Sequence, residues 1–263
     1  MIGLFLGSTD FPKIILNKVK KKKKKYFIID LTKINYFKKD KNSYFINIGK
    51  FGQILNLIKE KKCKKVLFSG KIDKPKILNL KFDIKGIYYL PRIIKASKLG
   101  DAAILKELIK ILAENKIKVI KSNYFNPELT LPKGSYTKIK PNKNDLIQIK
   151  QGISSLHGLN AYNHVQALVV RKNTIIAKET SRGTKKMLQS INKDKNNQGI
   201  LIKFPKKKQD LRADLPTIGL DTIKDCKKAN IKGVVLKANE NIFLDNVKCI
   251  SFANKNKIFI TII

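Results

Sequence analysis

The stretch IGLFLGSTDFPKIILNKVK at residues 2–20 decides the fold class, because its hydrophobic period changes part-way along. Residues 2–7 form a short apolar run of strand length, GST at 7–9 forms a turn, and the apolar residues of 10–20 keep helical spacing. A strand that passes through a glycine turn into a helix is the opening unit of an α/β domain. Such domains bind ligands at the carboxyl ends of their parallel strands.

The alternation of strands and helices continues through the first half of the chain. Further strands are predicted at YFIIDL (26–31), YFINI (44–48) and VLFSG (66–70). An amphipathic helix is predicted over 51–58, and 86–115 has the spacing of two helices. We expect Gly100 to close the first of these two helices and Asp101 to cap the second. This half therefore predicts an amino-terminal domain with a Rossmann-like, mostly parallel sheet.

A stretch rich in proline, glycine and asparagine, at 127–144, has no hydrophobic period and predicts a linker or exposed loop. Beyond it, the sequence predicts a helix from Asp145, a hairpin turning at 172–173, and strands at 199–204 and 233–238. We therefore expect a two-domain α/β protein. Its predicted limits are 1–130 for the amino-terminal α/β domain, 131–144 for the linker, and 145–263 for a distinct carboxyl-terminal α/β domain.

The net charge of +38 on 263 residues points to a polyanionic partner, either nucleic acid or anionic lipid. Only four of the 57 basic residues are arginine, whereas proteins that recognise DNA bases favour arginine, because its guanidinium group forms bidentate hydrogen bonds with base edges. The lysines are also spread along the chain rather than grouped between stacking aromatic residues. We therefore predict no specific nucleic-acid partner and interpret most of the charge as a solvated lysine surface.

Three cysteines, Cys63, Cys226 and Cys249, form no C-x-x-C pair, and an odd number of this kind predicts reduced thiols in a cytosolic protein. No apolar run approaches the roughly 18 residues that span a bilayer. Any contact with a membrane is therefore expected to be peripheral.

The densest polar segment is KFPKKKQDLRADLPTIGLD at 203–221, which contains three of the chain's 19 acidic residues. It sets Asp210, Asp214 and Asp221 among Lys203, Lys206, Gln209, Arg212 and Thr217. Phosphoryl transfer requires such a mixture, because cations offset the phosphate oxygens while a carboxylate holds a metal ion or positions water. The alternative is structural: the aspartates would cap turns or helices and Arg212 would form a surface ion pair.

Other candidate sites are weaker. The amides of the GSTD loop at 7–10 could face a phosphate, although the loop lacks the full G-x-G-x-x-G spacing. His157 and His164 have no acidic or cysteine companions at metal-ligand spacing. No nucleophile motif for acyl transfer is present.

Several separated segments together resemble the UDP-2,3-diacylglucosamine pyrophosphatases of the LpxI type. They are GKFGQILNLIKE (49–60), FSGKIDKP (68–75), LPRIIKASKLGDAAILK (90–106), TLPKG (130–134) and KFPKKKQDLRADLPTIG (203–219). The resemblance implies hydrolysis of UDP-2,3-diacylglucosamine to UMP and 2,3-diacylglucosamine 1-phosphate in lipid A biosynthesis. It also implies Mg²⁺ or a similar divalent ion, water attack on the sugar-linked phosphate, and an essential aspartate that falls on Asp214.

The resemblance also implies a lipid-linked UDP-sugar held between two domains. Because such a substrate has an anionic head and apolar tails, we expect a cytoplasmic enzyme that works at the inner face of the inner membrane. The catalytic candidates are Asp214 and Arg212, and Asp214 is also the candidate metal ligand. The substrate-binding candidates are Lys203, Lys206, Gln209, Thr217, Gly7, Ser8, Gly70, Gly100, Asp101, Gly183 and Thr184. An anionic membrane is the expected peripheral partner. The sequence leaves open whether the protein forms a homo-oligomer.

Three departures from the family pattern concern possible ligand contacts. The first loop is GSTD rather than glycine-rich, and the E-G-T-D motif of the family becomes RGTK, with Arg182 and Lys185 in place of acids. Gly183 and Thr184 of that motif are kept. Two other classes remain as alternatives: a basic nucleic-acid-binding protein, and a nucleotide-cofactor oxidoreductase in which Asp30 would bind the ribose.

Overall fold

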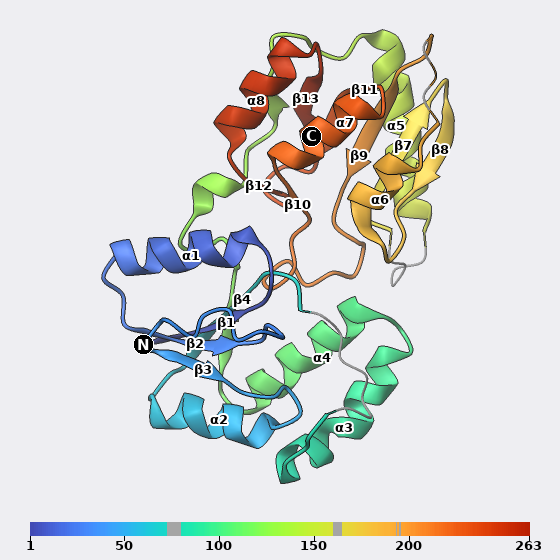
Figure 1. Ribbon diagram of the computed structural model, residues 1–263. Coiled ribbons are helices and arrows are strands. Elements are labelled where there is room, and N and C mark those ends of the chain that lie inside the picture. The colour runs from blue at the N-terminus through green and yellow to red at the C-terminus, as the bar shows by residue number, and fades with distance from the viewer. Residues whose placement is uncertain (73–79, 160–164, 193, 195) are drawn as a thin grey trace. The chain divides into compact units, whose positions relative to one another are not determined.

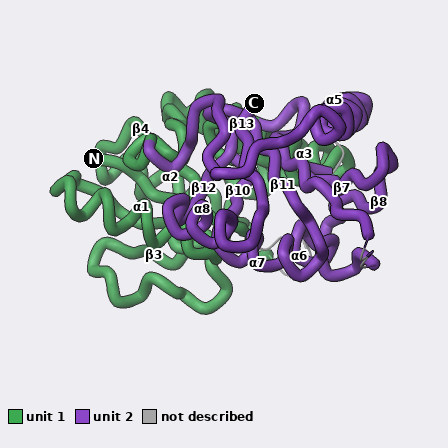
Figure 2. The backbone as a smooth tube through the Cα atoms, turned by 90° about the horizontal axis from the view of Figure 1, so that it is seen from above, with its two compact units in different colours: residues 1–127, 210–214 green, residues 128–209, 215–263 purple. Residues whose placement is uncertain are grey.

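The computed structural model describes residues 1–72, 80–159, 165–192, 194 and 196–263, so His164 and the end of the FSGKIDKP segment lie outside the described residues. The chain divides into two compact units, which Figure 2 shows in different colours. Unit 1 comprises Met1–Pro127 and Asp210–Asp214, and unit 2 comprises Glu128–Gln209 and Leu215–Ile263.

Unit 1 is built on a five-stranded sheet in the order β3-β2-β1-β4-β5, and all of its neighbouring strands are parallel. The strands are β1 (Ile2–Leu6), β2 (Tyr26–Asp30), β3 (Ser43–Phe45), β4 (Lys65–Ser69) and β5 (Lys118–Ile120). The chain runs outward from β1 in both directions, so the carboxyl end of β1 is the switch point where α/β proteins bind ligands. This arrangement confirms the fold class predicted for the first half.

Helices cover both faces of the unit 1 sheet, because its central strands are apolar along their whole length. The helices are α1 (Asp10–Lys21), α2 (Phe51–Glu60), α3 (Ile84–Ser97) and α4 (Asp101–Glu114). In Figure 1, α1 lies on one face of the sheet, and α2 and α4 lie on the other. Residues of α2 and α4 form one core with alternate residues of the strands, such as Phe5, Ile29 and Phe68.

One carboxylate joins the beginnings of α2 and α3. Asp83 is the N-cap of α3 and accepts a hydrogen bond from the Gly86 amide at 2.8 Å, and it also accepts bonds from the amides of Gly52 (3.0 Å) and Gln53 (2.9 Å) in α2. Burial opposes ionisation of Asp83, but these three amides stabilise the carboxylate and lower its pKa below the usual value. A Cβ at position 86 would lie 2.0 Å from the Gly49 carbonyl oxygen, so this close approach requires glycine.

Unit 2 contains a mixed six-stranded sheet in the order β6-β13-β11-β9-β7-β8. Its strands are β6 (Gly134–Ser135), β7 (Ala167–Arg171), β8 (Thr174–Lys178), β9 (Gly199–Lys203), β11 (Ile231–Leu236) and β13 (Phe259–Ile262). The central strands β9, β11 and β13 are parallel, and β6, β7 and β8 are antiparallel to their neighbours. Lys172 and Asn173 both have positive φ, as the predicted tight turn between β7 and β8 requires.

The helices of unit 2 pack on its sheet in two groups. They are α5 (Lys143–Gly158), α6 (Gly183–Gln189), α7 (Leu220–Lys228) and α8 (Asn246–Lys255). Ile149 of α5 packs with Leu168 and Ile202 in one core, whereas α6, α7 and α8 contribute to a second core with the alternate residues of the strands. A short parallel pair, β10 (Thr217–Ile218) and β12 (Ile242–Phe243), and a 3-10 turn, η2 (Pro127–Leu129), complete the described elements.

The two units differ from the predicted limits in three places. The first stretch of unit 1 ends at Pro127, so residues 128–130 belong to unit 2. Gly134 and Ser135, which the sequence places in a linker, form β6 and pair with β13 of unit 2. Asp210–Asp214, which the sequence places in the carboxyl-terminal domain, belongs to unit 1. The physical reason is that Ala213 packs against the unit 1 core and the Arg212 carbonyl accepts a hydrogen bond from the Ser122 amide at 2.7 Å.

No helix in the part of the chain that the structure describes is both long enough and apolar enough to cross a membrane.

Candidate active site

The predicted first loop follows β1 at the switch point of unit 1. The Gly7 amide donates to the Ser69 carbonyl at 2.9 Å, and Ser8 and Lys71 exchange two backbone hydrogen bonds of 2.8 and 3.1 Å. The backbone amides of Gly7 and Ser8 are therefore engaged at the edge of the sheet, so these two amides of the GSTD loop are not directed at a phosphate. A Cβ at Gly7 would lie 2.3 Å from the Lys71 carbonyl oxygen, and Gly70 has a φ of +86°, so both glycines shape this edge.

Two buried hydroxyl groups lie at the same edge of the sheet. Ser69 ends β4 and Ser122 follows β5, and the Oγ atoms of both serines have no hydrogen-bond partner among the described residues. The two strands are neighbours in the sheet. Because buried polar atoms are ordinarily satisfied, hydroxyl groups of this kind indicate where water or a ligand can bind. Neither serine was predicted as a site residue, although Ser69 lies in the FSGKIDKP segment, because a single serine at a strand end gives no signal of its own.

The turn Asp210–Asp214 places the predicted catalytic aspartate on unit 1. The amides of Ala213 and Asp214 donate to the Asp210 carbonyl oxygen at 3.1 and 3.0 Å, which closes one helical turn. The bond from the Ser122 amide to the Arg212 carbonyl fastens this turn beside the end of β5. The half-buried Asp214 therefore belongs to the carboxyl edge of the parallel sheet, the edge where an α/β unit binds its ligand.

Arg212 forms an ion pair inside this turn. Its Nε and Nη2 atoms donate to the two oxygens of Asp210 at 2.9 and 2.6 Å. The Arg212 guanidinium lowers the pKa of Asp210, and Lys106 of α4 adds to the effect. The structure thus shows the surface pairing that the sequence left open for Arg212.

The N-cap of α4 lies one residue earlier than the sequence predicted. Gly100, with a φ of +112°, occupies the N-cap position, and Asp101 is the first residue of the helix. The Gly100 carbonyl accepts bonds from the amides of Ala103 and Ile104. Asp101 places a negative charge in the first turn of α4, where the helix dipole favours it.

Unit 2 contains a buried polar chain around Lys203, the last residue of β9. The Lys203 ammonium donates to Thr184 Oγ1 at 2.7 Å, and the Thr184 hydroxyl donates to Glu179 Oε1 at 2.5 Å. All three side chains are buried. A buried ammonium and a buried carboxylate linked in this way compensate each other, so Lys203 is held as a fixed cation at the end of its strand.

The chain of hydrogen bonds continues through two glutamines. Glu179 Oε2 accepts a hydrogen bond from the backbone N–H of Gln166 at 3.1 Å. The side-chain Nε2 of Gln166 donates to Gln209 Oε1 at 2.9 Å. Gln209 Oε1 also accepts from the Lys206 amide at 2.8 Å, which ties the KFPKKKQ segment to this edge of the unit 2 sheet. Four of the substrate-binding candidates are therefore linked through this network. They are Lys203, Thr184, Gln209 and, through its backbone, Lys206.

Three members of this network were not predicted: Gln166, Glu179 and Asn241, whose Nδ2 donates to the Lys203 carbonyl at 3.1 Å. They precede β7, follow β8 and follow β11, so only the sheet brings them to one edge. One signal was available for Glu179, because it is one of only 19 acids in a strongly basic chain.

The remaining candidates are dispersed. The Thr217 hydroxyl donates to the nearby Leu215 carbonyl, and Gly183 begins α6 with a φ of +83°. Asp221 has a side chain that is 95% exposed on α7 in unit 2, whereas Asp210 and Asp214 belong to unit 1. Within the described residues, no group of three or more His, Cys, Asp or Glu side chains could hold a metal ion.

Asp30 has a structural role. It is fully buried at the end of β2, and its carboxylate accepts hydrogen bonds from the Thr32 amide, the Thr32 hydroxyl and the Phe37 amide. A carboxylate occupied in this way is not directed to a ribose. The oxidoreductase alternative thus loses its only candidate acid.

The cysteines have no reactive character. All three are buried and free of disulfides. Burial raises the pKa of each thiol, in the case of Cys249 to about 12, so none is a thiolate nucleophile at neutral pH.

An apolar cavity of about 130 Å³ lies within unit 1, and residues of α3 and α4 form part of its walls. Its walls include Phe51, Phe82, Leu90, Ile93, Ile104 and Leu108. A space of this volume with apolar walls accommodates a hydrocarbon fragment of about six carbons, by comparison with engineered apolar cavities of roughly 150 Å³ that bind benzene.

Comparison with known proteins agrees with this division into two parts. The model of the LpxI N-terminal domain matches residues 1–129, and the model of the LpxI C-terminal domain matches residues 132–261. The chain belongs to the LpxI family. A relative named "UDP-2,3-diacylglucosamine pyrophosphatase LpxI", from Caulobacter vibrioides, is 27% identical over 223 residues, which cover 82% of this chain and 80% of that protein. The LpxI assignment supports a hydrolase role in lipid A biosynthesis for this chain.

Proposed function

We propose that this LpxI-family chain hydrolyses the pyrophosphate of UDP-2,3-diacylglucosamine to UMP and 2,3-diacylglucosamine 1-phosphate. The name of the Caulobacter relative supports this reaction. The observation that carries the proposal is the turn Asp210–Asp214, which is fastened by Ser122 and Ala213 to the carboxyl edge of the unit 1 sheet. A carboxylate on a rigid turn at a ligand-binding edge has the placement that a water-positioning group requires.

In the proposed mechanism, Asp214 orients a water molecule toward the sugar-linked phosphorus and accepts its proton as the oxygen attacks. The bond from that phosphorus to the bridging oxygen breaks, and the bridging oxygen leaves on UMP. A phosphate leaving group is already a weak base, so no separate general acid is needed. Arg212 lies on the same turn as Asp214 and offsets part of the phosphate charge beside its ion pair with Asp210.

A divalent ion such as Mg²⁺ is part of this proposal. Mg²⁺ is commonly bound by one or two carboxylates together with substrate phosphates and water, and Asp214 fits this mode without a cluster of acids. When bound, such an ion offsets charge on the phosphate oxygens and makes water more acidic.

The lipid part of the substrate is supported by the apolar cavity of unit 1. Its walls are almost entirely hydrocarbon, which suits the end of an acyl chain and not a sugar or nucleotide. We further propose that the enzyme acts in the cytoplasm at the inner face of the inner membrane, because its substrate has an anionic head and tails that resist transfer to water.

Incubation of the purified protein with UDP-2,3-diacylglucosamine and Mg²⁺ in ¹⁸O-labelled water tests the reaction. Mass spectrometry should find UMP without label and 2,3-diacylglucosamine 1-phosphate with one ¹⁸O atom. Label in UMP would contradict attack at the sugar-linked phosphorus, and the absence of both products would contradict the function. UDP-glucosamine without acyl chains is the matched substrate control, and it should be turned over much more slowly.

A further inference from the structure

Helix α3 has large apolar side chains on the face that it turns to solvent. Ile84, Ile87 and Tyr88 are 87%, 61% and 73% exposed, and Ile94 is also exposed. The spacing of these residues places them along one side of the helix. Single exposed apolar residues are ordinary on protein surfaces, but a continuous stripe on one helix indicates an interaction surface. We call these four residues the outer face of α3.

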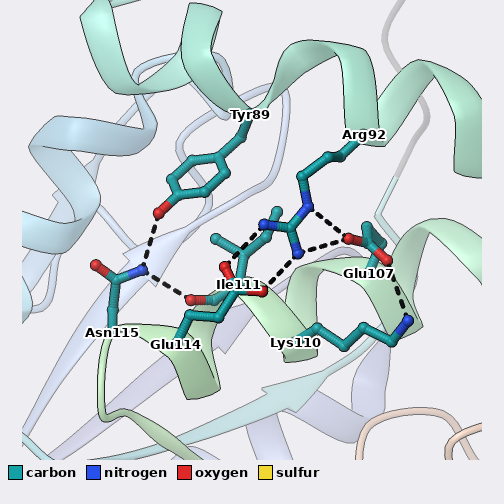
Figure 3. Close-up of polar contacts among 7 residues, drawn as sticks. All are labelled: Tyr89, Arg92, Glu107, Lys110, Ile111, Glu114 and Asn115. Carbon is teal, nitrogen blue, oxygen red and sulfur yellow. Dashed lines mark hydrogen bonds and ion pairs between the residues drawn. The ribbon is translucent and has the colours of Figure 1, made fainter.

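The inner side of the same helix is firmly held, so the outer face is not the result of a loose helix. Arg92 donates through Nη1 and Nη2 to the two oxygens of Glu114 at 2.8 and 2.7 Å and through Nε to Glu107 at 2.7 Å (Figure 3). Asn115 donates to the Tyr89 hydroxyl at 3.2 Å. These contacts join α3 to α4 and keep the inner side of α3 against the apolar cavity.

The charges around the outer face are positive. Lys85, Lys95 and Lys98 are exposed, and α3 contains no acidic residue. The acid that precedes the helix, Asp83, is occupied by amides of α2 and α3. A helix with exposed isoleucine and tyrosine beside lysines has the composition of helices that lie in the interface of an anionic bilayer.

We propose that the outer face of α3 docks on the surface of a bilayer that contains anionic phospholipid. Docking places the lysines at the headgroups and the isoleucines at the boundary with the acyl chains. The apolar cavity lies on the other side of this helix, about one helix diameter, or roughly 10 Å, from the leaflet. This inference deepens the proposed function, since it names the surface through which the enzyme would meet a lipid substrate.

Charge favours a bilayer over a second copy of the chain as the occupant of this face. A symmetric contact through α3 would bring Lys85, Lys95 and Lys98 of two copies together, and each copy has a net charge of +38. Like charges brought together in this way repel each other, whereas anionic headgroups attract them.

The chain contains no tryptophan, so a single introduced tryptophan reports on one position. We would compare Tyr88→Trp with Tyr124→Trp, because Tyr124 is 60% exposed and lies outside α3. Vesicles of phospholipid with about 30% anionic lipid, without any UDP-sugar, should shift the emission of the Tyr88→Trp protein to the blue, and brominated acyl chains should quench it. Emission of the Tyr124→Trp protein should stay that of an indole in water.

Vesicle flotation of a triple variant gives the second measurement. Ile84→Ser/Ile87→Ser/Tyr88→Ser should lower partition onto the anionic vesicles at least tenfold, while its circular dichroism stays native. The matched control Ile34→Ser/Ile147→Ser/Val247→Ser removes three other exposed apolar side chains with no change in charge, and it should stay within about twofold of the parent. Since no substrate is present, these results do not depend on the proposed reaction.

Equal partition of the two triple variants would overturn the proposal, as would quenching of the Tyr124→Trp protein in place of the Tyr88→Trp protein. A blue shift of Tyr88→Trp that appears without vesicles and grows with protein concentration would show that a second copy covers α3, and would overturn it as well.

Discussion

Asp214 is the residue on which the proposed chemistry depends. Asp214→Asn removes the base that accepts the proton from water while keeping nearly the same shape, so UMP release should fall by about 10²-fold or more. Asp221→Asn is the matched control, because Asp221 lies in the same sequence motif but has an exposed side chain on α7. Turnover of Asp214→Asn within tenfold of the parent enzyme would exclude Asp214 as the base.

Thr184 links two buried charges and can be tested separately from the chemistry. Thr184→Val removes the hydroxyl between Lys203 and Glu179, so the free energy of unfolding should decrease by about 1–3 kcal/mol. Thr184→Ser keeps the hydroxyl and should retain most of the stability and turnover. Urea unfolding measures the difference, and equal stability of the two variants would contradict the role of the hydroxyl.

At the scale of the element, Asp83 stabilises the beginnings of two helices. Asp83→Ala should decrease the free energy of unfolding by about 1–3 kcal/mol at neutral pH, because an N-cap and two further amide bonds are lost. Since the pKa of Asp83 in the folded protein lies below the unfolded value of about 3.9, its contribution is complete above that pH. It is lost as the pH falls through the lower, folded pKa.

Thermal unfolding at several pH values measures this effect. The gap between the parent protein and Asp83→Ala should narrow as the pH is lowered below about 4. Asp10→Ala is the control, since Asp10 is exposed in the first turn of α1 and no comparable gap is expected. If the stability difference between the parent protein and Asp83→Ala is the same at every pH, the lost stability comes from packing and not from the charge of Asp83.

The elements themselves were predictable where a local pattern determines them. The opening strand, turn and helix, the hairpin at 172–173 and the helix near 221–229 follow from residue spacing and turn chemistry, and the structure has all three. The place of Asp210–Asp214 was not predictable, because its partners Ser122 and the unit 1 core are distant in the sequence. Spacing indicates which face of an element is apolar, but it does not indicate what that face contacts.

The candidate site was predictable to a similar extent. The motif 203–219 supplied Lys203, Gln209 and Asp214, whose residue types suit phosphate chemistry. Glu179 and Gln166 were missed because a sheet, not a motif, brings them to Lys203. The hydrogen bonds of the Gly7 and Ser8 amides were missed for the same reason, since their acceptors lie at the end of β4 and just beyond it.

At the scale of the whole molecule, the net charge of +38 makes a further prediction. Binding to duplex DNA should be weak near physiological salt, with a Kd of about 10⁻⁴ to 10⁻⁶ M, and should weaken as salt rises, because counterion release alone drives it. Fluorescence anisotropy with several unrelated duplexes measures this. A single preferred duplex bound with a Kd below about 10⁻⁸ M would favour the nucleic-acid-binding alternative.

The turn Asp210–Asp214 also affects how this protein can be divided. Because the chain leaves unit 2 after Gln209 and re-enters it at Leu215, the units are joined by three covalent crossings instead of one. A gene fragment encoding only residues 1–127 lacks Ala213, a side chain that packs on its own core, and a fragment encoding 128–263 includes a segment that belongs to the other unit. Neither half is a transferable module, so recombination that exchanges one half for a foreign domain would separate the proposed catalytic aspartate from the sheet that holds it.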